Sequence, residues 1–422
     1  MDAGGAVQFG PLLRQARKKR GLSQSELGGD RYSGSYISHL ESGRRLASPE
    51  VIEFLSRRLG VSLLEWGTAA PGGDSRWMTR DGGVEDLMVA ERAWSDRDFG
   101  SAIAHSKQAA ESAAASGDST RHWEALYVMA QARFAAAEYA EAAQLAEELA
   151  EHQTAQRFSV ARAQALSLAS IANRASDRLG WAIAFGARAV EAASAAPPII
   201  LSEALMALVS AMSEAGHPPA EAQPFLDRLA RLAPRLTSDH SRGMIAWTQG
   251  AAAFVAGNPT AGLRFQEEAA KLLDQRRDLR LWLRFHSTAA SWRLGAGITD
   301  GVPELLKTAA FGLQMVGNSY DMVELRQAEA KLALITGDAE HARSMIQAVL
   351  DDPVYGAPEM ALGQSQLLLA QCLSALGKED AARRQFAIAA MQLEAEGRLR
   401  AAVDAWRSSA GQQILTELLT TT

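Results

Sequence analysis

One short stretch of the sequence, SGSYISHLESGRR at residues 33–45, combines hydrogen-bonding side chains with cations. Its apolar residues lie three positions apart, which predicts a short helix whose outer side carries Ser35, Ser38 and His39. Hydroxyl and imidazole groups can bond the edges of bases, but this outer side holds no Arg, Asn or Gln, the residues that most often read bases. The stretch by itself therefore leaves open what the helix binds.

Residue patterns that would support catalysis are missing from the sequence. The motifs HExxH, GxSxG and GxxxxGK[ST] do not occur, and the eight histidines are scattered. A single cysteine, Cys372, excludes an intramolecular disulfide and a Cys-rich metal site. We therefore expect no enzyme, no catalytic residue, no cofactor and no bound metal.

Helix signals in residues 9–66 predict the elements that position the polar stretch. Cations followed by Gly21 end a first helix. Ser23 with Glu26 three residues later predicts a capping box, so a second, very short helix begins at an exposed Gln24.

The same region contains signals for three further helices. Ser33 can cap the third helix, and Ser48 with Pro49 begins the fourth. Residues 62–66, SLLEW, supply a last short turn.

The succession LRQARKKRGLSQSEL, SYISHLESGRR and SPEVIEFLSRRLGVS resembles the five-helix helix-turn-helix domain of phage-repressor-type (XRE-family) transcription regulators, over residues 9–66. The resemblance implies that the third helix lies in the major groove of DNA and that Arg17 pairs with Glu41. Eight residues separate Leu27 from Tyr36, where the family more often has nine, which leaves individual base contacts open. The DNA-binding residues taken from the motif and its neighbours are Gln24, Ser35, Tyr36, Ser38, His39, Arg44 and Arg45.

Charge is divided unevenly along the 422 residues, whose formal net charge is −6. Residues 1–66 hold ten Lys and Arg against seven Asp and Glu, a net charge of +3, and the rest of the chain holds 33 against 42, a net charge of −9. A small basic module on a large acidic body fits a DNA-binding domain joined to a second domain of another function.

A repeat of 40 residues runs through the remainder of the chain. Every fortieth residue from position 102 is small in seven of eight cases: Ala102, Ala142, Ala182, Ala222, Gly262, Val302, Ala342 and Ala382. Twelve residues earlier stand Ala90, Ala130, Ser170, Ser210, Gly250, Ala290, Ala330 and Ala370. Seven residues later the position is always apolar: Ala109, Leu149, Ala189, Leu229, Ala269, Ala309, Val349 and Ala389.

Two small positions on either side of a turn predict pairs of antiparallel helices that touch closely. RDFGSAIAHSKQAAESA and GKEDAARRQFAIAAMQL resemble tetratricopeptide repeats, although the period is 40 rather than 34. The predicted fold is all-α: a five-helix domain followed by a superhelix, or solenoid, of about eight hairpins at 84–395 and a capping helix from Leu399 to Leu419.

The first helix of each hairpin lines the concave wall in tetratricopeptide stacks. An extended peptide would need amides and charges for its backbone and ends, and aromatic rings for its side chains. The effector-binding residues expected on this basis are Tyr127, Gln131, Phe134, Ser167, Asn173, Arg174, Glu214, Trp247, Gln327 and Lys331.

Together, the two parts resemble peptide-pheromone-responsive, quorum-sensing regulators of Gram-positive bacteria. This implies a homodimer that binds an inverted-repeat operator in double-stranded DNA and responds to a peptide effector. A small-molecule effector remains open, as does an interaction protein in which DNA binding is secondary. No apolar run of about 18 residues and no signal peptide is present, so we expect a cytoplasmic protein with no membrane partner. The expected division is a flexible N-terminus at 1–8, the DNA-binding domain at 9–66, a linker at 67–83 and the sensor and dimerisation domain at 84–422.

Overall fold

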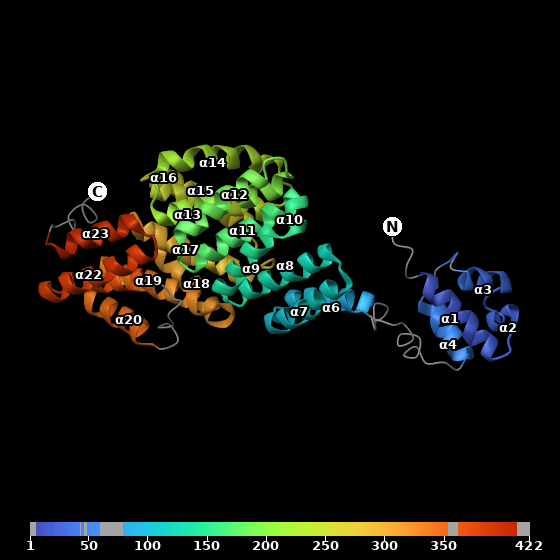
Figure 1. The fold of residues 1–422 in the computed structure, drawn as a ribbon. Coiled ribbons are helices and arrows are strands. Elements are labelled where there is room, and N and C mark those ends of the chain that lie inside the picture. The colour runs from blue at the N-terminus through green and yellow to red at the C-terminus, as the bar shows by residue number, and fades with distance from the viewer. Residues whose placement is uncertain (1–5, 43, 46–48, 60–78, 353–361, 412–422) are drawn as a thin grey trace. The chain divides into compact units, whose positions relative to one another are not determined.

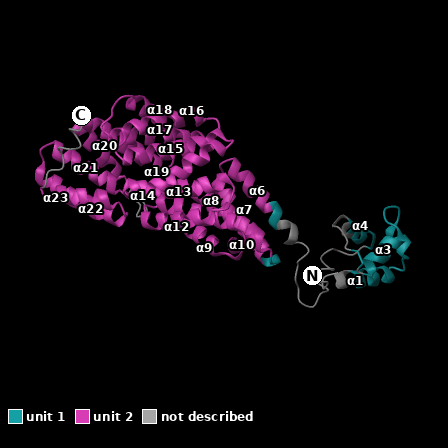
Figure 2. Ribbon diagram, turned by 90° about the horizontal axis from the view of Figure 1, so that it is seen from above, with its two compact units in different colours: residues 1–85, 115–117 teal, residues 86–114, 118–422 magenta. Residues whose placement is uncertain are grey.

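The computed structural model describes residues 6–42, 44–45, 49–59, 79–352 and 362–411. These residues form helices, turns and bends without a strand (Figure 1), which confirms the predicted all-α class. Contacts divide the chain into two compact units (Figure 2). The first comprises residues 1–85 and 115–117, and the second comprises residues 86–114 and 118–422.

Four described helices build the core of the first unit. They are α1 (Ala6–Lys19), α2 (Gln24–Gly28), α3 (Gly34–Glu41) and α4 (Pro49–Leu59). Their apolar sides meet in a cluster that includes Leu13, Leu27, Ile37, Leu40 and Leu55, each without exposed surface. The predicted fifth helix, at residues 62–66, and Ser48 lie outside the described residues.

The short helices begin where the predicted caps lie. Ser23 Oγ accepts a hydrogen bond from the Glu26 N–H at 3.1 Å, and a Glu26 carboxylate oxygen accepts one from the Ser23 N–H at 2.7 Å. Ser33 Oγ accepts a bond from the Tyr36 N–H at 3.2 Å and so starts α3. Because these bonds satisfy N–H groups that have no partner within the helix, they confirm the capping predictions.

Eight helical hairpins, each of two antiparallel helices, follow along the described chain, and a last helix comes after them. The hairpins are α6 (Thr79–Ser95) and α7 (Phe99–Ser116), α8 (Ser119–Ala135) and α9 (Tyr139–Glu151), α11 (Ser159–Ala175) and α12 (Leu179–Ala192), α13 (Pro198–Ala215) and α14 (Pro219–Leu232), α15 (Asp239–Val255) and α16 (Pro259–Leu272), α17 (Leu279–Gly295) and α18 (Val302–Val316), α19 (Ser319–Ile335) and α20 (Ala339–Asp351), and α21 (Gly363–Ala375) and α22 (Glu379–Ala395). The last helix is α23 (Leu399–Ser409), and two short pieces, α10 (Gln153–Arg157) and η1 (Ala233–Arg235), join hairpins. We number the hairpins as repeats 1 to 8.

Small residues of the 40-residue frame lie where the two helices of a hairpin touch. Ser170 Oγ donates a hydrogen bond to the Ala182 carbonyl at 2.7 Å, and a Cβ added at Gly250 would lie 3.5 Å from the Gly262 carbonyl oxygen. The apolar position seven residues later is buried in all eight repeats. The predicted close packing of the hairpins is therefore confirmed.

The turn inside the hairpin follows the frame in seven of the eight repeats, and in repeat 4 the positive-φ glycine, Gly216, lies one position earlier. Gly257, Gly297, Gly337 and Gly377 have positive φ angles, as a left-handed turn requires. The same frame position in repeats 1 to 3 holds residues other than glycine that also have positive φ, and one of them is Asp177 at +55°. Asp adopts this conformation more readily than most residues do.

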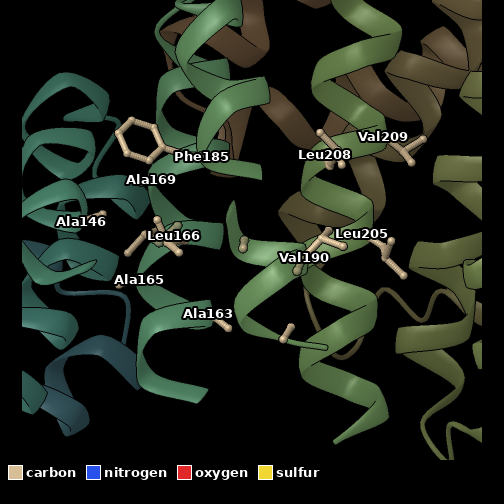
Figure 3. Packing of buried hydrophobic residues seen from close by; sticks show 14 of the residues in the cluster. Ala146, Ala163, Ala165, Leu166, Ala169, Phe185, Val190, Leu205, Leu208 and Val209 are labelled. Atoms are coloured by element: carbon tan, nitrogen blue, oxygen red, sulfur yellow. The ribbon is translucent and has the colours of Figure 1, made fainter. Parts of the chain in front are cut away.

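Buried side chains continue from one repeat to the next without a central core. Figure 3 shows this packing where α9, α11, α12 and α13 meet, with Leu166, Phe185 and Leu205 between the helices. Each of these side chains is 7% exposed or less. Stability in such a stack comes mainly from neighbouring repeats.

Helix α13 is the one described helix whose length and hydropathy would also suit a membrane span. Half of its 18-residue window is buried inside the second unit, including Leu205, Leu208 and Val209. A core helix of this solenoid has the same composition, which accounts for the apolar sequence.

Candidate nucleic-acid interface and effector-binding surface

The outer side of α3 is polar because its apolar residues turn inward. Ser35 and His39 are exposed, and Tyr36 and Ser38 are partly buried, while Ile37 is fully enclosed. The alternation follows from the helical period, which places residues three or four apart on one side. Hydrogen-bonding groups are therefore available along the whole length of α3.

Helices α2 and α3 enclose an open polar depression of about 680 Å³. Gly34 makes their close approach possible, because a Cβ there would lie 2.5 Å from Ser25 Oγ. The depression is lined by Ser23, Gln24, Ser25, Gly34, Ser35, Ser38, His39, Ser42 and Arg44. Five of the seven predicted DNA-binding residues are thus brought together, and the hydroxyls of Ser23, Ser25 and Ser42 are additions that the sequence pattern did not single out.

Glu41, at the end of α3, holds both Arg17 and Gln24. Its two carboxylate oxygens accept bonds from the Arg17 guanidinium at 2.5 and 3.0 Å, and one also accepts a bond from the Gln24 side-chain amide at 2.9 Å. Burial by itself would raise the pKa of Glu41, but the bonds from Arg17 and Gln24 outweigh it and lower that pKa. The implied Arg17–Glu41 pair is confirmed. Gln24 was expected to be exposed, but it is partly buried because its amide is bound to Glu41.

Tyr36 and Arg45 lie against each other beside the depression. The Arg45 guanidinium carbon is 4.7 Å from the centre of the Tyr36 ring, and Tyr36 stacks on Tyr32 at 5.2 Å. A cation over an aromatic face is electrostatically favourable. This contact places the exposed Arg45 near the polar side of α3.

Repeats 1 to 8 together with α23 are called the repeat domain. In this domain, several predicted effector-binding residues already have polar partners. Arg174 donates to Glu214, so these two predicted residues bind each other. Asn173 is fully buried and donates to Glu147 and to the Ala169 carbonyl, both at 2.9 Å.

The remaining predicted polar residues differ in how far they are engaged. Gln327 donates to Ser365 Oγ at 2.9 Å, and Ser167 is only 7% exposed. Neither Gln131 nor Lys331 has a polar partner among the residues that the structure describes. Partial burial lowers the pKa of Lys331.

The predicted aromatic residues pack against other rings. Tyr127 stacks on Trp123 with ring centres 5.0 Å apart, and its hydroxyl bonds to no described residue. Trp247 meets Phe285 edge-on at 5.5 Å inside an apolar cluster.

Phe134 belongs to the same pattern of ring contacts. It lies 5.2 Å from Tyr139, between ring centres, and packs on the cluster of Ala142, Ala143 and Ala172. Rings at helical spacing thus contribute to packing as well as to the surface.

A buried ion network in repeats 6 and 7 was missed by the sequence analysis. Asp321, 2% exposed, receives Arg280 Nε at 2.6 Å and lies 3.0 Å from Arg284 Nε. Desolvation would lower the pKa of Arg284, but Glu324, Asp321 and the more distant Glu214 raise it. The sequence does contain a signal for these ion pairs. Opposite charges about one 40-residue period apart, such as Arg280 with Asp321 and Arg174 with Glu214, lie side by side in consecutive repeats.

Comparison with known proteins assigns the first unit. Residues 13–66 match the helix-turn-helix family model, which confirms the prediction of a helix-turn-helix DNA-binding domain. No curated protein matches the chain.

Three solved structures are similar to the chain at low sequence identity. The crystal structure of Bacillus thuringiensis PlcR in complex with the peptide PapR7 and DNA matches over 77% of this chain and 99% of that one, with 11% identity and a TM-score of 0.31. A Rap protein complexed with competence and sporulation factor matches over 96% and 100%, with 10% identity and a TM-score of 0.40. The Rap conjugation gene regulator of the plasmid pLS20 in complex with the Phr* peptide matches over 97% of both chains, with 12% identity and a TM-score of 0.39.

Proposed function

We propose that this protein is a sequence-specific DNA-binding transcription regulator whose repeat domain binds an effector, a short peptide, that modulates DNA binding. The observation that carries the proposal is the polar depression between α2 and α3, which gathers Gln24, Ser35, Ser38, His39 and Arg44 in a unit that matches the helix-turn-helix family. Such a concentration of hydrogen-bonding groups on and beside one helix fits the major groove of DNA.

The residues around the depression divide between positioning and reading. Gln24, Tyr36, Arg44 and Arg45 would bind phosphates, which fixes the register of the protein on the duplex. Serine hydroxyls discriminate bases weakly, so His39 would carry most of the direct readout.

Two binding measurements test this division. Affinity for the promoter region of its own gene should fall steeply as salt rises, because each phosphate contact releases counterions. His39→Ala should weaken binding to the preferred sequence by about 1 to 3 kcal/mol and leave non-specific binding nearly unchanged. Binding without salt dependence would contradict DNA recognition and favour a pure interaction protein, and equal losses on both kinds of DNA would contradict the role of His39.

The effector proposal rests on polar groups of the repeat domain that have no described partner. The Gln131 amide and the Tyr127 hydroxyl can bond a peptide backbone, and the Lys331 ammonium can pair with a carboxylate. A short peptide carries both kinds of group, whereas a small molecule that lacks an anionic group would not use Lys331.

A thermal-shift series with peptide fractions of culture extract tests the effector. A peptide that stabilises the wild type should stabilise Lys331→Met less, because the charge pair is lost while the aliphatic stem remains. Lys307→Met, an exposed lysine of repeat 6, is the matched control. An equal shift in all three proteins would remove Lys331 from the site.

We further propose a homodimer that binds an inverted repeat, with residues 9–66 as the DNA-binding domain and residues 84–422 as the sensor and dimerisation domain. Half-sites would then lie about 10 base pairs, or a multiple, apart. An effector that prefers one curvature of the repeat domain by about 1 to 3 kcal/mol is enough to couple the two functions. Footprinting of the operator with and without the effector measures both the spacing and the coupling.

A further inference from the structure

Distant repeats of the second unit touch at one buried charged cluster. Arg398 lies in the turn between α22 and α23, and it donates to Asp177 at 2.6 Å although 221 positions separate the two residues. Its guanidinium also lies 3.8 Å from Glu214 and 3.4 Å from Glu396. The side chains of Arg398 and Asp177 are 20% and 14% exposed, so the pair is largely shielded from water.

The backbone itself is close at the same place. A Cβ added at Gly397 would lie 3.5 Å from Leu179 Cβ, and one added at Gly216 would lie 3.1 Å from Arg400 Cβ. The turn at the start of α23 therefore rests directly on the turns of repeats 3 and 4.

Asp177 itself occupies a turn position that favours glycine. The equivalent residue is glycine in repeats 5 to 8, whereas Asp177 keeps a side chain at a φ of +55°. That side chain is the one that receives Arg398, whereas the same position in repeats 1 and 2 holds Arg97 and Ala137.

A second crossing joins repeats 2 and 7. The ring centres of Tyr139 and Tyr320 are 4.7 Å apart, and Asn318 donates to the Tyr139 hydroxyl at 3.1 Å. The two crossings join repeats in the first half of the stack with repeat 7 and with the turn before α23.

These contacts differ in kind from those that hold the stack together. Neighbouring repeats share apolar faces, and in stacked-repeat proteins such faces supply most of the stability. The Arg398 contact is ionic, and its carboxylates oppose one another: burial and the charge of Asp177 raise the pKa of Glu396 to about 7. The distant contact can therefore break while every hairpin remains folded.

We propose that Arg398, with Asp177, Glu214 and Glu396, forms a latch that holds the repeat superhelix closed and sets its curvature. The inference goes beyond the proposed function, because it concerns the conformation of the second unit whether or not an effector is a peptide. Release of the latch separates repeats 3 and 4 from α23 and leaves the hairpins intact.

Disulfide trapping in the full chain tests the latch. A Cβ added at Gly397 lies within disulfide range of Leu179 Cβ, but a Cys there must keep the φ of +77°, which is strained for a residue with a side chain. Leu179→Cys with Gly397→Cys should therefore cross-link slowly when diamide oxidises the two thiols. Adding Arg398→Met should slow this cross-linking at least fivefold, while the circular dichroism of the helices stays the same. Arg326→Met, which removes a cation paired with Glu329 inside one helix, is the matched control and should not change the rate.

The outcomes of the trapping experiment separate clearly. Cross-linking at the same rate with and without Arg398→Met would overturn the latch. If Arg398→Met loses helix content, Asp177→Asn decides instead, because Asn tolerates a positive φ and removes the charge on the other side. DNA-binding measurements do not enter this test, so its result is independent of the proposed regulator function.

Discussion

Replacement of Glu41 by glutamine should loosen the helix-turn-helix unit from within. Glu41 is 8% exposed and binds Arg17, whose side chain is 11% exposed, through two oxygens. Glutamine keeps the shape but removes the charge, which leaves the Arg17 guanidinium partly buried without a counterion. It also weakens the bond that holds Gln24 beside the depression.

The magnitude follows from the burial of this pair. Removing one partner of a buried ion pair lowers the free energy of unfolding by about 3 to 5 kcal/mol. Loss of an exposed ion pair lowers it by only about 0 to 1 kcal/mol. Because water still reaches part of Arg17 and glutamine can accept one of its bonds, we expect about 2 to 3 kcal/mol for Glu41→Gln. The lowered pKa of Glu41 means that its stabilisation is present above its ordinary pKa and is lost as pH falls through the lowered value.

Hydrogen exchange of the full chain, read by mass spectrometry, measures the loss of stability separately in the helix-turn-helix unit and in the repeat domain. Peptides from α1 and α3 should open about 30- to 150-fold more often in Glu41→Gln at neutral pH, and peptides from the repeat domain should not change. Asp30→Asn, which removes an exposed carboxylate from the turn after α2, is the control. If the opening free energy of α3 changed by less than about 0.5 kcal/mol, the Arg17–Glu41 pair would be screened by water like an exposed pair. That result would refute the estimate for a buried pair.

Two further predictions concern the repeat domain. Gly186→Ala should lower the free energy of unfolding by about 1 to 3 kcal/mol, because a Cβ there would lie 3.0 Å from Leu208 Cα. Gly180→Ala, in open space on the same helix, should raise it by up to about 1 kcal/mol. Urea unfolding measures both variants, and equal effects would contradict the packing seen at Gly186. Glu396 lies among Asp177, Arg398 and the Gly363 N–H, and its pKa is raised to about 7. Its protonated form therefore adds about 3 kcal/mol to the free energy of unfolding, which is fully present below its ordinary pKa of 4.5 and is lost as pH rises through 7. Glu396→Gln should remove this pH dependence between pH 5 and 8 in urea unfolding, and an unchanged pH profile would contradict the prediction.

Most of the architecture could be predicted from the sequence because the information is local. Ser23, Glu26 and Ser33 cap helices through bonds that span three residues, and the 40-residue frame needs only the packing of adjacent helices. The helix-turn-helix assignment for residues 13–66 is confirmed for the same reason, since it depends on the order of short elements. The choice of DNA-binding and effector-binding residues stays a prediction.

What the tertiary structure alone decided is which polar groups meet across long separations. Arg174 looked available for an effector, but it binds Glu214 one repeat later, and Asn173 is enclosed. Glu41 holds Gln24 as well as Arg17. The sequence by itself determined the helices and their spacing, because each repeat depends on near neighbours. The contact of Arg398 with Asp177 depends on the accumulated rotation of five repeats, a quantity that no local pattern contains.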